Sequence, residues 1–229
     1  MIWLRSALFN TFFFGVTFVM TLMGTGIYLL APARSADVAR VWARVIIGGL
    51  RLICGIDFTV LGAERLPRTG PALIASQHQS TFDTLVWITL LPRCCYVLKR
   101  ELLRIPLFGR LIPAAGMIAI DRRAPVSALR ALARAGAEAV RQGRQIVIFP
   151  EGTRAEPGQF LALQPGVAAL AARTNLPVIP VATDSGLYWG RRAFRKRPGT
   201  IRIRLHQPLP PELPRAELMQ RLTSLLREL

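Results

Sequence analysis

The sequence predicts an α/β fold, in which a single domain with a mostly parallel central sheet flanked by helices follows an N-terminal hydrophobic, membrane-associating helical segment. Two observations lead to this fold class. After residue 55, short apolar runs suited to buried strands alternate with longer stretches of helical periodicity, which is the pattern of a parallel sheet. Before that point, no residue from Ser6 to Ala33 is charged.

The first 54 residues are expected to form membrane-associating helices. The uncharged stretch exceeds the roughly 20 residues that a spanning helix needs, so we expect it to cross a membrane or to lie deeply embedded in one. Its glycines and threonines leave a helix that lies in the membrane interface as the alternative. Ala31-Pro32-Ala33 resembles a signal-peptide cleavage site, but signal peptides have apolar regions of only about 7–15 residues, so we expect the segment to be retained.

A second helix is expected over residues 36–53, with Ser35 as a suitable N-cap. Arg40, Arg44 and Arg51 lie on one side of this helix, beside apolar bulk. Such a basic stripe suits a membrane interface. The alternative is an ordinary amphipathic helix with a solvated arginine face.

The remaining residues, 55–229, are expected to form the α/β domain. Residues 56–60 alternate like a half-buried strand, whereas residues 72–75 and 146–149 are continuous apolar runs typical of buried strands. Further strands are expected at residues 96–98, 117–120, 178–182 and 201–205, and helices at residues 82–91, 126–142 and 166–174. Leucines at helical spacing within residues 211–229 predict a last helix that packs on the domain.

The composition indicates contact with lipid and with anions. Hydrophobic residues make up 52% of the chain, against about 45–50% in typical soluble domains. The formal net charge is +17, from 30 Lys and Arg against 13 Asp and Glu, and a field of this sign attracts anionic lipids and phosphorylated substrates. Nucleic acid is also an anion, but no helix-turn-helix, zinc-finger or RNP-like motif accompanies the charge, so we expect no nucleic-acid partner.

The cysteines predict neither a disulfide framework nor a zinc site. They are Cys54, Cys94 and Cys95, an odd number without a C-x-x-C pair. We therefore expect a reducing compartment and no metal ligands among them.

The segment from Gln77 to Asp83 is the first candidate site, because it follows a buried strand and precedes a helix, where open α/β sheets place their sites. Ser80 is a suitable N-cap, which puts Asp83 in the first helical turn and close to His78. A histidine that is hydrogen-bonded to a carboxylate can act as a general base, because the carboxylate accepts one ring N–H and so fixes the tautomer. No G-x-S-x-G elbow supplies a nucleophile, so the hydroxyl that is activated is expected to belong to the substrate. The alternative is structural, with Asp83 completing the helix cap.

The segment from Phe149 to Arg154 is the second candidate, and it also follows a strand. Gly152 permits a tight turn there, and Arg154 has the geometry to hold a phosphate by two parallel hydrogen bonds. Glu151 is expected to orient Arg154 or a substrate hydroxyl, with a surface ion pair as the alternative.

A third segment, from Trp189 to Arg197, is strongly basic and contains aromatic residues. It suits anionic head groups, the phosphates of CoA or an acidic carrier protein. A solvated run of charge is the alternative.

Four motifs in and between these segments resemble the glycerolipid acyltransferase family, specifically the 1-acyl-sn-glycerol-3-phosphate acyltransferases. The first is H-x-x-x-x-D from His78 to Asp83. The second begins at Lys99 and ends at Arg122, the third is residues 149–154, and the fourth is residues 176–181. They occur in the family's order and together cover about half of the chain.

The resemblance implies a general-base mechanism without a covalent enzyme intermediate. His78 would deprotonate the acceptor hydroxyl, which attacks the thioester of acyl-CoA or acyl carrier protein, and Asp83 would orient His78. The residues implied to shape the acceptor pocket are Lys99, Arg122, Glu151, Gly152, Thr153 and Arg154, with the arginines on the phosphate. No metal and no bound cofactor are implied, since the thioester is a substrate.

The expected reaction acylates the sn-2 hydroxyl of 1-acyl-glycerol-3-phosphate and gives phosphatidic acid in phospholipid biosynthesis. The expected partners are the lipid bilayer, the lysophospholipid, the acyl thioester and an acyl carrier protein. The expected location is the inner membrane, with the catalytic domain facing the cytoplasm, where acyl thioesters are made. A lyso-ornithine lipid or another lysolipid is the alternative acceptor, and a lipid-binding membrane protein is the non-enzymatic alternative.

Overall fold

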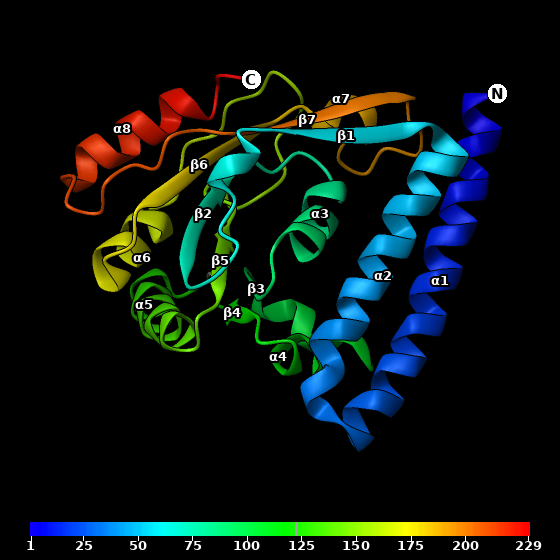
Figure 1. Cartoon of the computed structure of the whole chain (residues 1–229), viewed down its shortest axis with the longest axis horizontal. Helices are drawn as coiled ribbons and strands as arrows, with labels where there is room; N and C mark the ends of the chain where they lie inside the picture. Colours follow the sequence, from blue (N-terminus) through cyan, green and yellow to red (C-terminus); the bar gives the residue numbers. More distant parts are fainter. Residues whose placement is uncertain (122) are drawn as a thin grey trace.

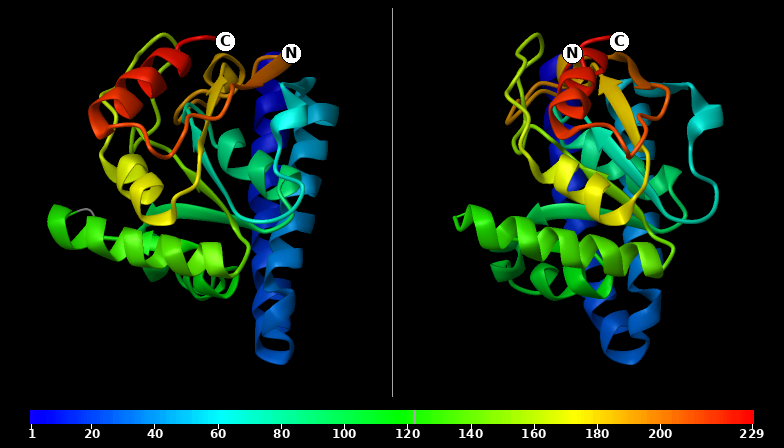
Figure 2. Two further views of the ribbon diagram at one scale, coloured as in Figure 1. Left: turned by 60° about the vertical axis from the view of Figure 1, so that its left-hand side comes forward. Right: turned by 90° about the vertical axis from the view of Figure 1, so that its left-hand side faces the viewer.

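The two N-terminal helices form an antiparallel hairpin that lies along one side of the domain (Figure 1). The protein is described by a computed structural model that covers residues 1–121 and 123–229. Helix α1 is Ile2–Leu30 and α2 is Ser35–Gly49, and a π-helical turn, Leu50–Cys54, leads from α2 into the domain. The end of the hairpin projects beyond the rest of the molecule (Figure 2).

Within the described residues, seven strands form one sheet in the order β1-β7-β6-β2-β5-β3-β4. They are β1 Ile56–Leu61, β2 Ala72–Ser76, β3 Cys94–Lys99, β4 Ile118–Ile120, β5 Gln145–Ile148, β6 Val178–Thr183 and β7 Gly199–Leu205. Every neighbouring pair is parallel except β6 and β7. Strand β2 lies between β5 and β6 and is buried along its whole length, which explains its continuous apolar run.

Helices cover both faces of the sheet (Figures 1 and 2). Helix α3, Phe82–Leu90, packs with α1 and α2 on one face, where Ile74 and Val147 point into a shared core. Leu73 and Ile146 point to the other face, which is covered by three helices. These are α5 Pro125–Arg141, α6 Gly166–Thr174 and α8 Arg215–Leu225. The opposite directions of neighbouring strand residues are the period of two that a pleated strand requires.

The predicted fold class is confirmed, and the differences concern short helices. Helix α4, Phe108–Ala114, and helix α7, Ser185–Tyr188, were not predicted, because neither is long enough to display helical periodicity. The division into residues 1–54 and 55–229 stays a prediction; the chain changes from helix to strand at Gly55, whose φ of 66° favours glycine.

Helix α1 is the helix in the described part of the chain that is long and apolar enough to cross a membrane. Its buried residues are Ser6, Phe9 and Gly24, and most of its apolar side chains, including Phe14 and Phe18, are exposed. Large exposed apolar surfaces of this kind mark contact with a membrane or a partner. The helix therefore indicates membrane association.

Candidate active site

The two predicted polar segments meet at the carboxyl ends of neighbouring parallel strands. Strands β2 and β5 are paired in parallel, and the last residue of β5, Ile148, lies opposite Ala75. The backbone N–H of His78 donates to Oε2 of Glu151 at 2.9 Å. The N–H of Ala155 donates to the carbonyl of His78 at 2.8 Å. The segments that the sequence places more than seventy residues apart therefore form one site.

One carboxylate oxygen of Asp83 lies within hydrogen-bond distance of three nitrogen atoms. Oδ2 accepts hydrogen bonds from the backbone N–H groups of Gln79 and Ser80, both at 2.7 Å, and lies 3.2 Å from Nδ1 of His78. The Asp83 side chain is only 3% exposed. Because Nδ1 faces the carboxylate, Nε2 is the ring nitrogen that is left to accept a proton from a substrate. The structure thus brings together the pair that the sequence predicts.

The start of α3 fixes this geometry. The N-cap position is Thr81, one residue later than expected, while Oγ of Ser80 accepts a hydrogen bond from the N–H of Phe82 at 3.0 Å. Asp83 lies in the first helical turn, as expected, and folds back towards the preceding loop. An acidic residue is favourable there because the helix N-terminus carries partial positive charge.

Aromatic packing fixes the plane of the imidazole ring. The ring of His78 stacks on Phe149, with centroids 4.1 Å apart, and Phe149 stacks on Tyr96 at 5.8 Å. The hydroxyl of Tyr96 donates to the carbonyl of Asp83 at 3.2 Å. The imidazole of His78 is therefore fixed by the Phe149 ring against one face and by the Asp83 carboxylate at its edge.

Glu151 lies behind His78 and does not line the cavity of the site. Burial raises the pKa of Glu151 to about 8, an effect that its hydrogen bond from His78 opposes and the charge of Asp83 increases. Near neutral pH this carboxyl is therefore mostly protonated. The alternative of a surface ion pair is wrong, since Glu151 is buried. Its direct contact with a substrate hydroxyl stays a prediction.

Arg154 follows a tight turn at Gly152, whose φ is 71°. Arg154 lines the cavity, and its Nε is buried with no hydrogen-bond partner within the described residues. Burial lowers the pKa of Arg154; the charge of Asp83 partly offsets this, and the charge of Arg191 adds to it. The site therefore contains a partly buried cation that forms no ion pair with a carboxylate of the described residues.

The cavity that contains these groups has a volume of about 570 Å³. Its polar lining includes His78, Thr153 and Arg154 from the strand ends. Part of its apolar lining comes from the hairpin and α4, and includes Met20, Gly24, Val38, Trp42, Leu111 and Ile112. The sequence indicated that the hairpin meets lipid, but its part in the cavity wall depends on how it packs.

Most of the predicted binding residues lie around this cavity. Lys99, Gly152, Thr153 and Arg154 line it with His78, whereas Asp83 and Glu151 support His78 from behind. Arg122 lies outside the described residues. Two further arginines, Arg191 and Arg192, line the cavity and were not predicted as site residues; the basic segment that contains them was the signal in the sequence.

Comparisons with known proteins identify the family of the chain. A family model described as acyltransferase matches residues 57–184, which include both polar segments. The chain is 38% identical to the 1-acyl-sn-glycerol-3-phosphate acyltransferase of Pseudomonas aeruginosa, over 87% of this chain and 78% of that protein. The chain belongs to the acyltransferase family. The resemblance inferred from the four motifs is thereby confirmed.

Other relatives carry the same name. The chain is 33% identical to the 1-acyl-sn-glycerol-3-phosphate acyltransferase of Limnanthes douglasii, over 72% of this chain and 59% of that protein. It is 30% identical to the alpha form from Homo sapiens, over 74% of this chain and 60% of that protein. The crystal structure of the 1-acyl-sn-glycerophosphate acyltransferase PlsC from Thermotoga maritima superposes with a TM-score of 0.78 at 22% identity, over 99% of this chain and 95% of that chain, which confirms the fold.

Proposed function

We propose that the protein is a 1-acyl-sn-glycerol-3-phosphate acyltransferase, which moves a fatty acyl group from a thioester to the sn-2 hydroxyl and gives phosphatidic acid in phospholipid biosynthesis. The observation that carries the proposal is an imidazole, oriented by Asp83, in the same cavity as a partly buried arginine that forms no ion pair with the described residues. The relatives described above have this activity in their names. A lipid-binding protein without turnover would gain nothing from an oriented base.

The proposed reaction uses His78 first as a base and then as an acid. Nε2 takes the proton of the sn-2 hydroxyl while the hydroxyl oxygen attacks the carbonyl carbon of the thioester. The tetrahedral intermediate then collapses, the carbon–sulfur bond breaks, and the proton passes from His78 to the leaving thiolate. Asp83 stabilises the imidazolium that exists between these steps. The acyl group moves directly to the acceptor, and we propose that neither a metal nor a bound cofactor takes part.

The acceptor is proposed to be recognised by its phosphate. A phosphomonoester carries up to two negative charges and three oxygens, which match the fork of the Arg154 guanidinium. The interaction is strengthened because burial removes part of the Arg154 side chain from water. Lys99, Arg122 and Thr153 are proposed as further contacts. A lyso-ornithine acceptor is disfavoured because it offers no phosphate to this arginine.

The donor is proposed to be acyl-CoA or acyl carrier protein, since both present the same thioester on a pantetheine arm. The apolar wall formed by α1, α2 and α4 suits a hydrocarbon chain.

The protein is proposed to act at the inner membrane, with its catalytic domain on the cytoplasmic side. We favour a hairpin embedded in one face of the bilayer, because α2 runs back along α1 and carries Arg40 and Arg44. A spanning α1 would draw these charges towards the hydrocarbon, which is costly. Protease protection in sealed vesicles tests the orientation, and a domain protected on the side away from the cytoplasm would contradict it.

Acyl transfer by the purified full chain tests the proposed function. Free thiol and phosphatidic acid should appear together when 1-acyl-sn-glycerol-3-phosphate is mixed with acyl-CoA or acyl carrier protein. The matched control is His78→Ala, which should release almost no thiol. A folded wild-type protein that transfers nothing from either donor to this acceptor would contradict the proposal.

A further inference from the structure

The cavity contains more positive charge than a single arginine contact uses. Lys99, Arg154, Arg191 and Arg192 line it, and none of the four forms an ion pair with a carboxylate of the described residues. The nearby acids offset this charge only in part: the charge of Asp83 acts on Arg154, but its carboxylate is already hydrogen-bonded to His78 and two backbone N–H groups, and the carboxyl of Glu151 is buried. Like charges gathered in one cavity repel each other and favour binding of an anion.

Arg191 is the member of this group that lies directly against Arg154. Its Nη1 donates to the backbone carbonyl of Arg154 at 3.3 Å. The backbone N–H of the next residue, Ala155, donates a hydrogen bond to the carbonyl of His78 at 2.8 Å. Arg191, Arg154 and His78 are therefore successive neighbours around one cavity, although Arg191 belongs to the segment between α7 and β7.

The segment that carries Arg191 is fixed at one end by aromatic packing on α1. Trp189 is buried and meets Phe9 edge-to-face, with ring centroids 5.3 Å apart, and Phe13 at 5.8 Å. Such pairs add to the free energy of burial. This end of the segment is therefore held by the hairpin.

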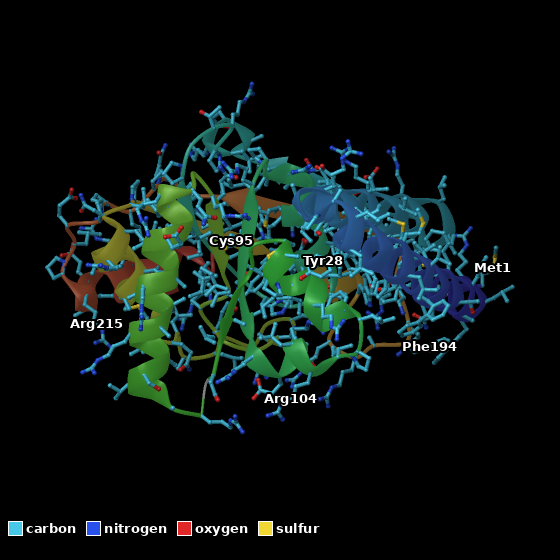
Figure 3. The ribbon with its side chains drawn as sticks, turned by 90° about the horizontal axis from the view of Figure 1, so that it is seen from below. Met1, Tyr28, Cys95, Arg104, Phe194 and Arg215 are labelled. Carbon is cyan, nitrogen blue, oxygen red and sulfur yellow. The ribbon has the colours of Figure 1, made fainter. Side chains whose placement is uncertain are left out.

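A buried lysine fixes the other end. Lys196 is 3% exposed; its Nζ donates to Oδ1 of Asn10 and to the carbonyl of Phe194, and its backbone N–H donates to Oγ of Ser6 at 2.9 Å. Phe194 and Met1 lie at the same end of the molecule (Figure 3). Anchors on both sides hold the segment in place, and the hydrogen bond from Nη1 keeps the exposed side chain of Arg191 beside Arg154 despite the repulsion of the two charges.

We propose that Arg191 and Arg154 together bind the phosphomonoester of the acceptor, an inference that rests on the proposed function and extends its phosphate site to the segment between α7 and β7. In 1-acyl-sn-glycerol-3-phosphate the phosphate is attached to the carbon next to the one that bears the reacting hydroxyl, so it must lie in the cavity that His78 and both arginines line. In the thioester donors, the nearest phosphate lies at the far end of the pantetheine arm. A dianion also gains more from two guanidinium forks than a singly charged phosphodiester does.

Steady-state kinetics of Arg191→Gln in the full chain tests this assignment. Arg197→Gln is the matched control, because Arg197 lies in the same basic segment but not in the cavity lining. We expect Arg191→Gln to raise the KM for 1-acyl-sn-glycerol-3-phosphate by about tenfold or more, with kcat and the KM for the donor nearly unchanged. The loss should be smaller for the phosphate methyl ester of this acceptor, and Arg191→Lys should recover part of it. Arg197→Gln should resemble the wild type.

The outcomes separate this inference from the proposed function. A raised KM for the donor alone would overturn the assignment to the acceptor, and so would a variant that matches Arg197→Gln. Calorimetric titration of the protein with 1-acyl-sn-glycerol-3-phosphate, without donor, measures the affinity for the acceptor and so tests the arginine pair in the absence of turnover. If the wild type proved inactive, the proposed function would fail. A tenfold lower affinity of Arg191→Gln for the acceptor, about 1.4 kcal/mol of binding free energy, would still support the arginine pair. An affinity equal to that of the wild type would reject it.

Discussion

The two halves of the candidate site differ in how completely their polar groups are bonded. In the base half, Asp83 faces three nitrogen atoms and Glu151 accepts the backbone N–H of His78. In the arginine half, Nε of Arg154 is buried without a partner, and Arg154 and Arg191 share no carboxylate among residues 1–121 and 123–229. We therefore propose that the base is oriented before substrate arrives, whereas an anion completes the arginine half.

The largest effect should follow from removing the base. We expect His78→Ala to lower kcat by about 10²- to 10⁴-fold, because general-base catalysis contributes rate factors of this size. Turnover should be measured by thiol release at saturating acceptor, and near-ultraviolet circular dichroism should establish that the variant is folded. A folded His78→Ala protein with near-normal turnover would show that the base half does not act as described.

A smaller loss is expected from Asp83→Asn, which keeps the shape of the side chain but removes its charge. We expect kcat to fall by about 10- to 10³-fold, and by less than in His78→Ala, because orientation and imidazolium stabilisation are only part of what the base requires. Turnover of both variants should be compared at the same pH. An Asp83→Asn variant as active as the wild type would mean that the 3.2 Å contact with His78 has no part in turnover.

Substitutions in the arginine half should have effects that depend on whether the acceptor carries a phosphate. Hydrogen bonds to charged groups contribute roughly 1.5–3 kcal/mol, so Arg154→Ala should lower kcat/KM for a phosphate-bearing acceptor by about ten- to a hundredfold. Arg154→Lys should recover only part of the loss, since an ammonium keeps the charge but not the fork. Kinetics with acceptors that differ only in the phosphate check this, and equal losses on both would assign Arg154 to the fold or the donor.

A separate effect concerns Glu151 and appears in stability rather than turnover. Its pKa is raised from 4.5 to about 8, so between these values the native protein holds a proton that the unfolded chain releases. Stability is therefore fully present below the lower value and falls as pH rises towards the upper one, by at most about 1.4 kcal/mol per pH unit. Glu151→Gln removes this dependence while its amide oxygen still accepts the His78 N–H. Denaturant unfolding of both proteins from about pH 5 to pH 8 checks it, and parallel curves would contradict a buried neutral Glu151.

The base half was predictable from the sequence because its geometry is local. His78 lies in the loop after a buried strand and Asp83, five residues later, lies in the first turn of the following helix, so secondary structure alone brings them together. The strands were predictable for a similar reason, since burial on both faces leaves continuous apolar runs such as β2. The buried, neutral state of Glu151 was not predictable from the sequence, because a sequence does not show how far a side chain is buried.

The arginine half depends on contacts between distant parts of the chain. Arg191 lies 37 residues after Arg154, and its position follows from the packing of Trp189 on Phe9 and of Lys196 on Asn10. A basic run in the sequence predicts an anion but not which anion, because charge alone carries no geometry. The same limit applies to the hairpin, whose hydropathy indicated lipid but not its part in the cavity wall.

The most direct test of the difference between the halves is a comparison of His78→Ala and Arg154→Ala on two acceptors, 1-acyl-sn-glycerol-3-phosphate and phosphate-free 1-monoacylglycerol, with one thioester donor. His78→Ala should lower product formation from both acceptors by a similar factor, because the base acts on the hydroxyl. Arg154→Ala should lower it strongly only for the acceptor that carries phosphate. Retained transfer in His78→Ala, or an equal loss on both acceptors in Arg154→Ala, would contradict the division of the site into a base half and a phosphate-binding half.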